Sequence, residues 1–341
     1  MTRAVRSLYV GAGAWSGETG KIQRFELDLE RGALSLRQEL DAGGVAAFMA
    51  RSSDGRHLYV ADETKGSLAS YAIAQSGELS LTSHVACAGH PVYVSLDPSG
   101  RSLATCFFQE AKTQIFAINP DGTLGQSAFV ADSGRESHST VFDPSGRFLF
   151  VPTRGDNWIA QYRFDADSRS LVSNQPERVV EDPGAGPRHL AFHPNGRFAY
   201  LVNELTLSLS VYAFDSDSGT LRSLQRSIPA APSGKSGGAA ADIHIHPNGC
   251  VAYLSNRQDA ASNIAIFALD PESGAATLVG HESTRGRTPR NFALDRDGTL
   301  LIAGNQDSAE LAIFRIARAG LALEYVRSVP VAPGPFFLGI Y

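Results

Sequence analysis

The sequence is poor in the features that stabilise extracellular domains or anchor a chain in a membrane. Only three cysteines occur in 341 residues (Cys87, Cys106 and Cys250), and their spacing matches no metal-binding pattern. No apolar run is long enough to cross a membrane as a helix. The opening segment, MTRAVRSLYVGAG, lacks the apolar core of a signal peptide. We therefore expect a cytoplasmic protein with reduced thiols.

A large excess of charge of one sign is also missing. The chain has 30 Lys and Arg against 35 Asp and Glu, for a net charge of −5, and the basic residues are scattered. This distribution argues against a nucleic-acid groove and against binding to an anionic membrane. The sequence also lacks a nucleophile elbow, a Cys–His pairing and a Walker loop, so the enzyme classes that depend on them are not indicated.

What the chain does contain is a repeat. An alternating apolar run with a central aromatic residue recurs at intervals of about fifty residues, which is typical of a propeller. The runs include IQRFELD, LASYAIA and IAIFALD. Their central residues are Phe25, Tyr71, Phe116, Tyr162, Tyr212, Phe267 and Phe314.

A second phrase precedes the aromatic runs. Turns such as Pro-Ser-Gly and Pro-Asn-Gly join two short strands, as in HPNGRFAYLVNE, because glycine accepts the positive φ of such turns. Each unit then contains four antiparallel strands. RSLYVGAG near the start and PGPFFLGIY at the end complete a seventh unit when joined. The sequence predicts an all-β, seven-bladed β-propeller over residues 1–341, one domain whose terminal strands close the ring.

Antiparallel pairing places the start of each first strand and the end of each second strand at one axial face. The turn between them, with His193 and His246, lies at the opposite face, where we expect these imidazoles to form hydrogen bonds within the turn. First-strand starts contribute His138, Arg188, His189, Asp242, His244, Arg290 and Asn291 to the first face. Second-strand ends contribute Asp62, Glu63, Arg154, Asn203, Glu204, Asn256, Arg257, Asn305 and Gln306.

Two interpretations of this polar face are open. The polar groups can simply hydrate the mouth of the channel, or they can form a ligand site. Up to four guanidinium groups, from Arg154, Arg188, Arg257 and Arg290, would repel one another there. They require either nearby carboxylates, such as Glu204 and Asp242, or an anionic ligand. No spacing singles out a set of metal ligands. We expect no cofactor, although dependence on a metal ion is left open.

The chain resembles the seven-bladed β-propeller lactonases of the bacterial 6-phosphogluconolactonase type, which are related to carboxymuconate cycloisomerases. The resemblance spans the whole chain and is most specific in GPRHLAFHPNGRFAYLVNEL, ADIHIHPNGCVAYLSNR and TPRNFALDRDGTLLIAGNQ. It implies hydrolysis of an acidic sugar lactone. The positions that match the proposed sites of the family are His138, Arg188, His189, Asp242, Arg257 and Arg290.

The predicted site follows from this resemblance together with the face assignment. The catalytic candidates are His138, His189, Asp242 and Arg188, and either histidine can serve as the base. The substrate-binding candidates are Arg154, Asn203, Glu204, His244, Arg257, Arg290, Asn305 and Gln306. Arg154 stands in TRGDN, where the family more often has acidic residues, and this change favours a more anionic substituent such as a phosphate, a sulfonate or a second carboxylate.

The expected partner is therefore a small anionic sugar lactone, bound by a monomer or a weak homo-oligomer. Two other functions remain open from the sequence. A cycloisomerase that forms a lactone from a muconate-type diacid would use the same acid groups and anion clamps. A non-catalytic scaffold propeller would present an apolar docking patch on one face.

Overall fold

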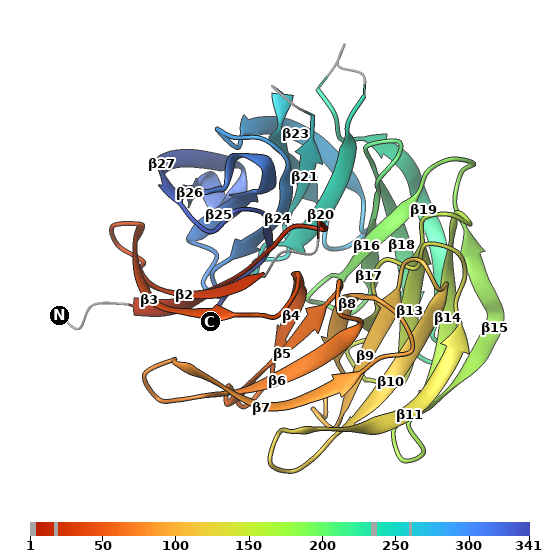
Figure 1. Cartoon of the computed structure of the whole chain (residues 1–341). Helices are drawn as coiled ribbons and strands as arrows, with labels where there is room; N and C mark the ends of the chain where they lie inside the picture. Colours follow the sequence, from red (N-terminus) through yellow and green to blue (C-terminus); the bar gives the residue numbers. More distant parts are fainter. Residues whose placement is uncertain (1–4, 17–19, 233–236, 259–260) are drawn as a thin grey trace.

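The computed structural model describes residues 5–16, 20–232, 237–258 and 261–341. These residues form seven four-stranded antiparallel sheets around a common axis, and the colours in Figure 1 run once around the ring. The predicted fold class is confirmed. The innermost strands are β4, β8, β12, β16, β20, β24 and β28. Neighbouring innermost strands contact one another around the ring, except that β16 contacts mainly β13 rather than the short β12.

The first three sheets in chain order are β4 (Ala46–Arg51), β5 (His57–Asp62), β6 (Ser67–Ile73) and β7 (Leu79–Ala86); β8 (Pro91–Leu96), β9 (Ser102–Phe107), β10 (Lys112–Ile118) and β11 (Leu124–Asp132); and β12 (Val141–Phe142), β13 (Phe148–Thr153), β14 (Trp158–Asp165) and β15 (Ser170–Val180). The next three are β16 (Pro187–Phe192), β17 (Phe198–Asn203), β18 (Ser208–Asp215) and β19 (Thr220–Pro229); β20 (Ala239–Ile245), β21 (Val251–Arg257), β22 (Asn263–Leu269) and β23 (Ala276–Ser283); and β24 (Pro289–Leu294), β25 (Leu300–Asn305), β26 (Glu310–Ala317) and β27 (Ala322–Pro330).

The seventh sheet closes the ring. It consists of β28 (Pro335–Ile340), β1 (Val5–Ala12), β2 (Lys21–Asp28) and β3 (Ala33–Asp41), so the last strand of the chain pairs with the first. Leu8 lies opposite Ile340, and Val10 lies opposite Leu338. This pairing satisfies the backbone edge that β1 would otherwise expose. Joining RSLYVGAG with PGPFFLGIY, as the sequence predicts, is therefore confirmed.

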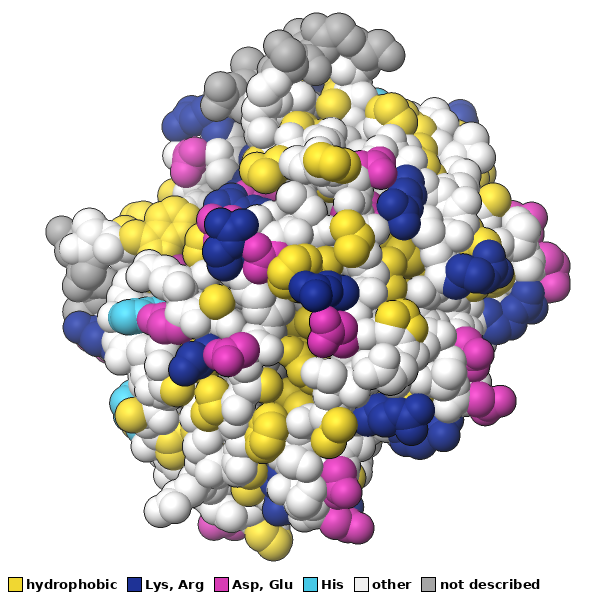
Figure 2. Space-filling view, turned by 90° about the vertical axis from the view of Figure 1, so that its right-hand side faces the viewer, with side chains coloured by type: hydrophobic (Ala, Val, Ile, Leu, Met, Phe, Trp, Pro, Cys, Tyr) yellow, Lys and Arg dark blue, Asp and Glu magenta, His cyan; other side chains and the backbone are white. Residues whose placement is uncertain are grey.

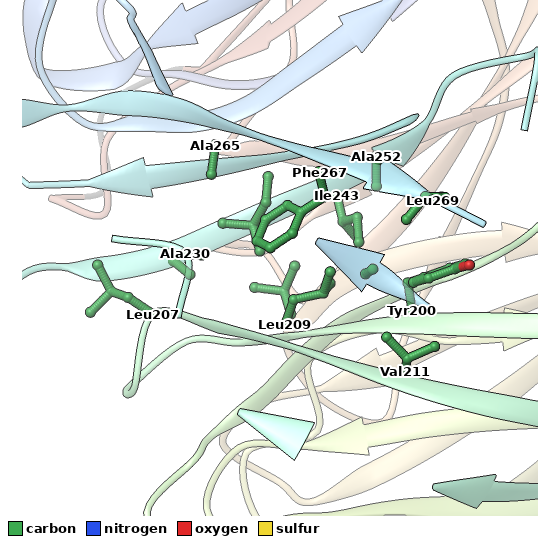
Figure 3. Packing of buried hydrophobic residues seen from close by; sticks show 14 of the residues in the cluster. Tyr200, Leu207, Leu209, Val211, Ala230, Ile243, Ala252, Ala265, Phe267 and Leu269 are labelled. Atoms are coloured by element: carbon green, nitrogen blue, oxygen red, sulfur yellow. The ribbon is translucent and has the colours of Figure 1, made fainter. Parts of the chain in front are cut away.

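The hydrophobic core lies between adjacent sheets. Figure 3 shows one such layer, in which Leu209 and Val211 from β18 lie close to Ile243 from β20 and Phe267 from β22. These side chains are almost fully buried. Alternation along each strand directs every second residue into such a layer, which is why the aromatic runs recur once per sheet.

Hydrogen bonds across the sheets add to this packing at the turn face. The hydroxyl of Tyr253 donates to the carbonyl of Gly320 in the next sheet at 2.6 Å, and Tyr200 bonds Gly274 in the same way at 3.0 Å. His193 accepts the turn N–H of Asn195 at 3.1 Å, as expected for bonding within the turn. Its other ring nitrogen also bonds a main-chain carbonyl of the next sheet, at Gly249. His246 has the same arrangement, with Asn248 and Gly298.

One innermost strand is shorter than its sequence pattern predicts. The phrase HSTVFD yields only β12, Val141–Phe142, and the preceding residues leave the regular ladder. Pro152 on the neighbouring β13 explains the difference, because its carbonyl accepts the N–H of His138 at 3.0 Å but its own nitrogen has no hydrogen to return. His138 therefore lies in a less regular backbone at the edge of the axis.

The side of the ring drawn in Figure 2 carries no region of one charge sign. Figure 2 shows basic and acidic side chains interspersed on the side of the molecule that faces right in Figure 1. None of the helices in the described ranges is long and apolar enough to cross a membrane.

Candidate functional site

Local irregularities in the innermost strands position the site. The strands β16, β20 and β24 each carry one extra residue relative to the second strand of their sheet, near the start of the strand. The register shifts lie between Pro187 and Leu190, between Ala240 and Ile243, and between Pro289 and Asn291. Such a bulge bends the strand and redirects its side chains. Arg188, His189, Asp242 and Arg290 all occupy these bulges, so residues from three sheets meet at one end of the axis.

A buried carboxylate organises the imidazole groups. Asp242 accepts a hydrogen bond from Nδ1 of His189 at 2.8 Å, and its second oxygen lies 3.1 Å from Nε2 of His244. The side-chain amide of Asn291 also donates to Asp242. His189 contacts Tyr93 from β8, with ring centres 5.2 Å apart. The orientation of the His189 ring is therefore fixed from both sides.

A second carboxylate lies among three guanidinium groups. Glu204 is 2.7 Å from Arg154, 2.8 Å from Arg188 and 3.3 Å from Arg257. Burial acts to raise the pKa of Glu204, but these guanidinium groups outweigh burial and lower the pKa to about 2. The carboxylate neutralises only part of the surrounding positive charge. Arg154 is also paired with Glu136 at 2.8 Å, so its own charge is well matched.

Arg290 is held differently. Its guanidinium carbon lies 5.0 Å from the ring centre of Trp15 and 4.8 Å from that of Phe336. Within the part of the chain that the structure describes, Arg290 forms no ion pair within 4.0 Å. Aromatic faces stabilise a cation without neutralising its charge. Its polar N–H groups thus remain suited to an anionic ligand.

His138 lies beside this cluster. Its ring centre is 5.4 Å from that of His189, and its Nε2 is 3.8 Å from a carboxylate oxygen of Glu204. Its Nδ1 is buried without a hydrogen-bond partner in the described structure. The Nε atom of Arg257 and one oxygen of Glu63 are also buried and unpartnered here. Such buried groups are costly unless a ligand or water satisfies them.

Burial sets the protonation states of the two imidazoles. Burial lowers the pKa of His189 to about 4, with a further contribution from Arg188 that the hydrogen bond to Asp242 only partly offsets. Burial also lowers the pKa of His138 well below its usual value, again with help from Arg188. Both rings are therefore neutral at pH 7 and able to accept a proton.

The predicted residues separate into two groups according to strand alternation. Arg154 and Glu204, which follow the last residues of β13 and β17, and Arg257, the last residue of β21, reach the axis. Side chains alternate along a strand, so the preceding position faces away from the axis. Asn203 donates to Ser210 at 2.9 Å, in a buried network with Glu181, and Asn305 donates to the carbonyl of Thr284 at 2.8 Å. Gln306 begins the short helix η2 (Gln306–Ser308).

The structure therefore brings together nine of the twelve predicted residues. They are His138, Arg154, Arg188, His189, Glu204, Asp242, His244, Arg257 and Arg290. His244 belongs to this group through Asp242, but it lies two residues farther along β20 towards the opposite face. The catalytic and binding roles of all of these residues stay predictions.

Trp15 and Phe336 were absent from the predicted site, and Glu63 was predicted at this face but not among the site residues. Trp15 and Phe336 enclose Arg290, and Glu63 lies near enough for Arg290 to act on its ionisation. Burial raises the pKa of Glu63, which Arg290 counteracts only in part. The rule for strand ends could have found Trp15, because it follows β1, the second strand of the closing sheet. Trp15 is aromatic, whereas the residues predicted at this face are all polar.

No group of three or more His, Cys, Asp or Glu side chains within residues 5–16, 20–232, 237–258 and 261–341 is arranged to hold a metal ion. The charged groups at the axis consist instead of interleaved guanidinium and carboxylate groups. Such a site favours binding of an anion and transfer of a proton at an imidazole.

Known proteins are similar to this chain in sequence and in fold. A profile of the family described as "Lactonase, 7-bladed beta-propeller" matches residues 7–338. A 6-phosphogluconolactonase of Pectobacterium carotovorum is 35% identical over 326 residues, which cover 95% of this chain and 96% of that protein. A 6-phosphogluconolactonase of Xenorhabdus nematophila is 31% identical over 325 residues, with 95% and 97% covered. The solved periplasmic gluconolactonase of Pseudomonas aeruginosa has a TM-score of 0.90, 30% identity and 99% of each chain covered.

Proposed function

The chain belongs to the seven-bladed β-propeller lactonase family, and we propose that it hydrolyses the cyclic ester of an acidic sugar, such as 6-phosphogluconolactone, to the open-chain sugar acid. The observation that best supports this activity is a neutral imidazole, His189, fixed by Asp242 at 2.8 Å beside several guanidinium groups. The relatives favour this function over a muconate cycloisomerase and over a scaffold propeller.

Hydrolysis needs a base for water and a donor for the developing oxyanion. Asp242 accepts a hydrogen bond from the Nδ1–H of His189, so Nε2 is the unprotonated nitrogen and accepts a hydrogen bond from Arg188. In the described structure this nitrogen lies 3.1 Å from Nη1 of Arg188. A lactone bound there would place its carbonyl oxygen within reach of the Arg188 donor and a water molecule within reach of the imidazole. His138, also neutral, is the second candidate for the base.

The reaction then balances in two steps. His189 takes a proton from water as the water oxygen bonds to the lactone carbonyl carbon, and the negative charge on the carbonyl oxygen is stabilised by Arg188. The tetrahedral intermediate collapses by breaking the bond to the ring oxygen, which receives the proton from His189. The product is a hydroxy acid that ionises at neutral pH.

The acidic group of the substrate would bind to Arg290 and Arg257. Arg290 has no carboxylate partner within the described ranges, and Arg257 shares Glu204 with two other arginines. Arg154 is less suited to this role than its sequence context predicts, because Glu136 and Glu204 already neutralise it. A phosphate is the group we favour, since two guanidinium forks can surround it.

Three finer properties belong to the same proposal. Residues 1–341 act as one lactonase domain, the protein is a monomer or a weak homo-oligomer, and it works in the cytoplasm. A periplasmic relative is known, so cell fractionation is the direct check of the compartment. Size-exclusion chromatography with light scattering checks the oligomeric state.

The activity is tested by generating 6-phosphoglucono-δ-lactone and glucono-δ-lactone in solution and following proton release in a weakly buffered indicator assay. We expect the wild type to accelerate opening of the phosphorylated lactone more strongly. His189→Ala should reduce kcat by about a hundredfold or more, the usual contribution of a general base. Arg290→Gln should raise KM for the phosphorylated lactone more than for the neutral one.

His193→Ala is the matched control, because this histidine lies on the opposite face. Its effect on kcat should be small once unfolding is accounted for. Equal rates for wild type and His189→Ala would remove His189 from the chemistry, and a parallel loss in His138→Ala alone would assign the base to His138. The absence of any acceleration by the wild type on either lactone would refute the proposed function.

A further inference from the structure

A cavity of about 1090 Å³ lies on the other side of the ring from the imidazole cluster. Its wall includes Arg51, the last residue of β4, whereas the site lies near the first residue of that strand, Ala46. At about 3.3 Å per residue, the two ends of β4 are about 17 Å apart. The remaining wall comes from the closing sheet, from the turn between β4 and β5, from the end of β6 and the turn that follows it, and from the turn between β24 and β25. The cavity is therefore separate from the proposed lactonase site.

Positive charge dominates the cavity wall. Five arginines line it, against Glu26 as the one acidic side chain. The arginines are Arg6, Arg24, Arg51, Arg56 and Arg296. Glu26 is already paired with Arg37 at 3.2 Å, so it contributes little to neutralising the wall. Elsewhere on the outer side of the ring, Figure 2 shows the two charge signs interspersed.

Three of these guanidinium groups lack a carboxylate. Arg56 pairs with Asp54 at 2.8 Å, and Arg6 lies 3.8 Å from Asp297. For Arg24, Arg51 and Arg296, the described residues offer no ion pair within 4.0 Å. An unneutralised charge away from bulk water is unfavourable unless an anion accompanies it.

Two of the three are also partly removed from solvent. Arg24 is only 8% exposed, and it donates to the carbonyl of Ser76 and to the hydroxyl of Ser7. Arg51 donates to the carbonyl of Gly55 at 3.3 Å, and its Nε is buried with no partner in the described structure. These bonds use a minority of the five N–H groups on each side chain. Donors on both guanidinium groups thus remain unfilled beside the cavity.

Aromatic rings accompany these arginines. The guanidinium carbon of Arg51 lies 5.3 Å from the ring centre of Tyr341, and Tyr9 lines the same cavity. Both rings are packed, so the arginines nearest to them have little freedom to turn away. A preorganised set of forked donors favours the planar or tetrahedral oxygens of a carboxylate or a phosphate. Because several arginines converge, a ligand with more than one negative charge matches the wall best.

We propose that this cavity is a second binding site, on the turn face of the propeller, for a small molecule that carries a phosphate or diphosphate group. Arg24 and Arg51 bind the anionic group, and Arg296 closes over it from the turn between β24 and β25. The size of the cavity is within the range of small-molecule sites. The site is independent of lactone hydrolysis.

The test is calorimetric titration of the full chain with inorganic pyrophosphate at constant ionic strength, with sodium chloride as the balancing salt. Arg51→Gln and Arg296→Gln are each expected to weaken binding about tenfold or more, the usual effect of losing a hydrogen bond to a charged group. Arg101→Gln is the matched control, because Arg101 is an exposed arginine in the turn between β8 and β9, which corresponds to the turn between β24 and β25 that carries Arg296. It should change the affinity less than twofold.

Arg290→Gln separates the two faces. Binding that survives Arg290→Gln but weakens in Arg51→Gln supports the second site. Binding lost in Arg290→Gln and unchanged in Arg51→Gln assigns the anion to the axial site and overturns the inference, as does the absence of pyrophosphate binding. Unchanged melting and lactone hydrolysis in Arg51→Gln and Arg296→Gln establish that both variants are folded. If Arg101→Gln weakens binding as much as they do, general charge attraction is responsible and the inference fails.

Discussion

Glu204 is the residue on which the arrangement of the axial arginines depends. It contacts Arg154, Arg188 and Arg257 while being almost fully buried. Burying these charges is unfavourable by itself, and their mutual attraction offsets that cost only while the carboxylate is present. The carboxylate therefore has a structural role that is distinct from catalysis.

We expect Glu204→Gln to lower the free energy of unfolding by about 3 kcal/mol, because three guanidinium groups lose their common counter-charge. Urea denaturation measures the change. Added phosphate should recover part of the loss by binding among the arginines. Glu272→Gln, which removes an exposed partner of Arg197, is the control and should cost less than about 1 kcal/mol. Equal effects of the two substitutions would contradict the role given to Glu204.

Acid should inactivate the protein at a lower pH than an ordinary histidine base would allow. Burial lowers the pKa of His189 to about 4, so protonation that abolishes the base occurs well below the usual value of about 6.5. We expect kcat/KM to stay level from pH 7 to about pH 5 and to fall through about pH 4. A midpoint near 6.5 in the measured profile would show that another, less buried group acts as the base.

The same pKa shift affects stability in a defined direction. The unfolded chain takes up a proton at this histidine below about pH 6.5, whereas the folded protein does so only near pH 4. The contribution of His189 is therefore neutral above pH 6.5 and increasingly destabilising as the pH falls between these two values.

Much of the site could be predicted from the sequence, because strand ends map onto one axial face. The direction in which single side chains point could not be predicted. Asn203 and Asn305 are at the correct end of their strands, but a pleated strand turns them into their own sheets, and only the next position points to the axis. No turn residue in the sequence signals the bulge that directs the side chains of Arg188 and His189 towards the site.

At the level of the element, the second strands β1, β5, β17 and β21 each form a hydrogen bond to the following sheet. Tyr9, Tyr59, Tyr200 and Tyr253 each donate a hydrogen bond to the carbonyl of a glycine in the following sheet. A buried hydroxyl requires such an acceptor. The bonds fix the rotation between neighbouring sheets and thereby the convergence of their inner strands.

Tyr253→Phe should lower the free energy of unfolding by about 1 kcal/mol, since it removes one buried hydrogen bond without opening a cavity. Thermal and urea denaturation measure this effect. Tyr325→Phe is the matched control, because Tyr325 is exposed and its hydroxyl bonds the nearby Ser328 at 3.2 Å. A loss of the same size in both variants would indicate that the bond to Gly320 does not contribute to stability.

The strand pattern itself was predictable to a large extent, because period-two alternation and turn glycines are local signals. The exception is β12. Pro152 in FVPTR was visible in the sequence, but its effect appears only when β13 is paired and its missing N–H faces the inner strand. Pairing of this kind is a property of the sheet and not of either segment alone.

At the scale of the whole molecule, closure depends on β28. Removing residues 335–341 exposes the edge of β1 and the core side chains that pack against Leu338. We expect the shortened chain to melt at a lower temperature and to self-associate, because an open edge strand pairs readily with other chains. Light scattering and thermal melting measure these changes.

A synthetic peptide with the sequence PFFLGIY should restore the ring in trans by adding the missing strand. A peptide with the same residues in scrambled order is the control, since it retains the composition but not the order that buries Phe336, Phe337 and Leu338. If the shortened chain melts as the full chain does, closure by β28 is not required for the fold.

At the turn face, the tyrosine and histidine bonds between sheets end on the main-chain oxygens of glycines. A Cβ at any of these glycines would lie less than 3.0 Å from a neighbouring atom, so the bond requires glycine at that one position and leaves the other residues of the turn unconstrained. Apart from these glycines, the outer hairpins are free to diverge in composition while the inner ends of the strands stay in alignment. Side chains on the outer hairpins can therefore change repeatedly without disturbing the alignment of the innermost strands.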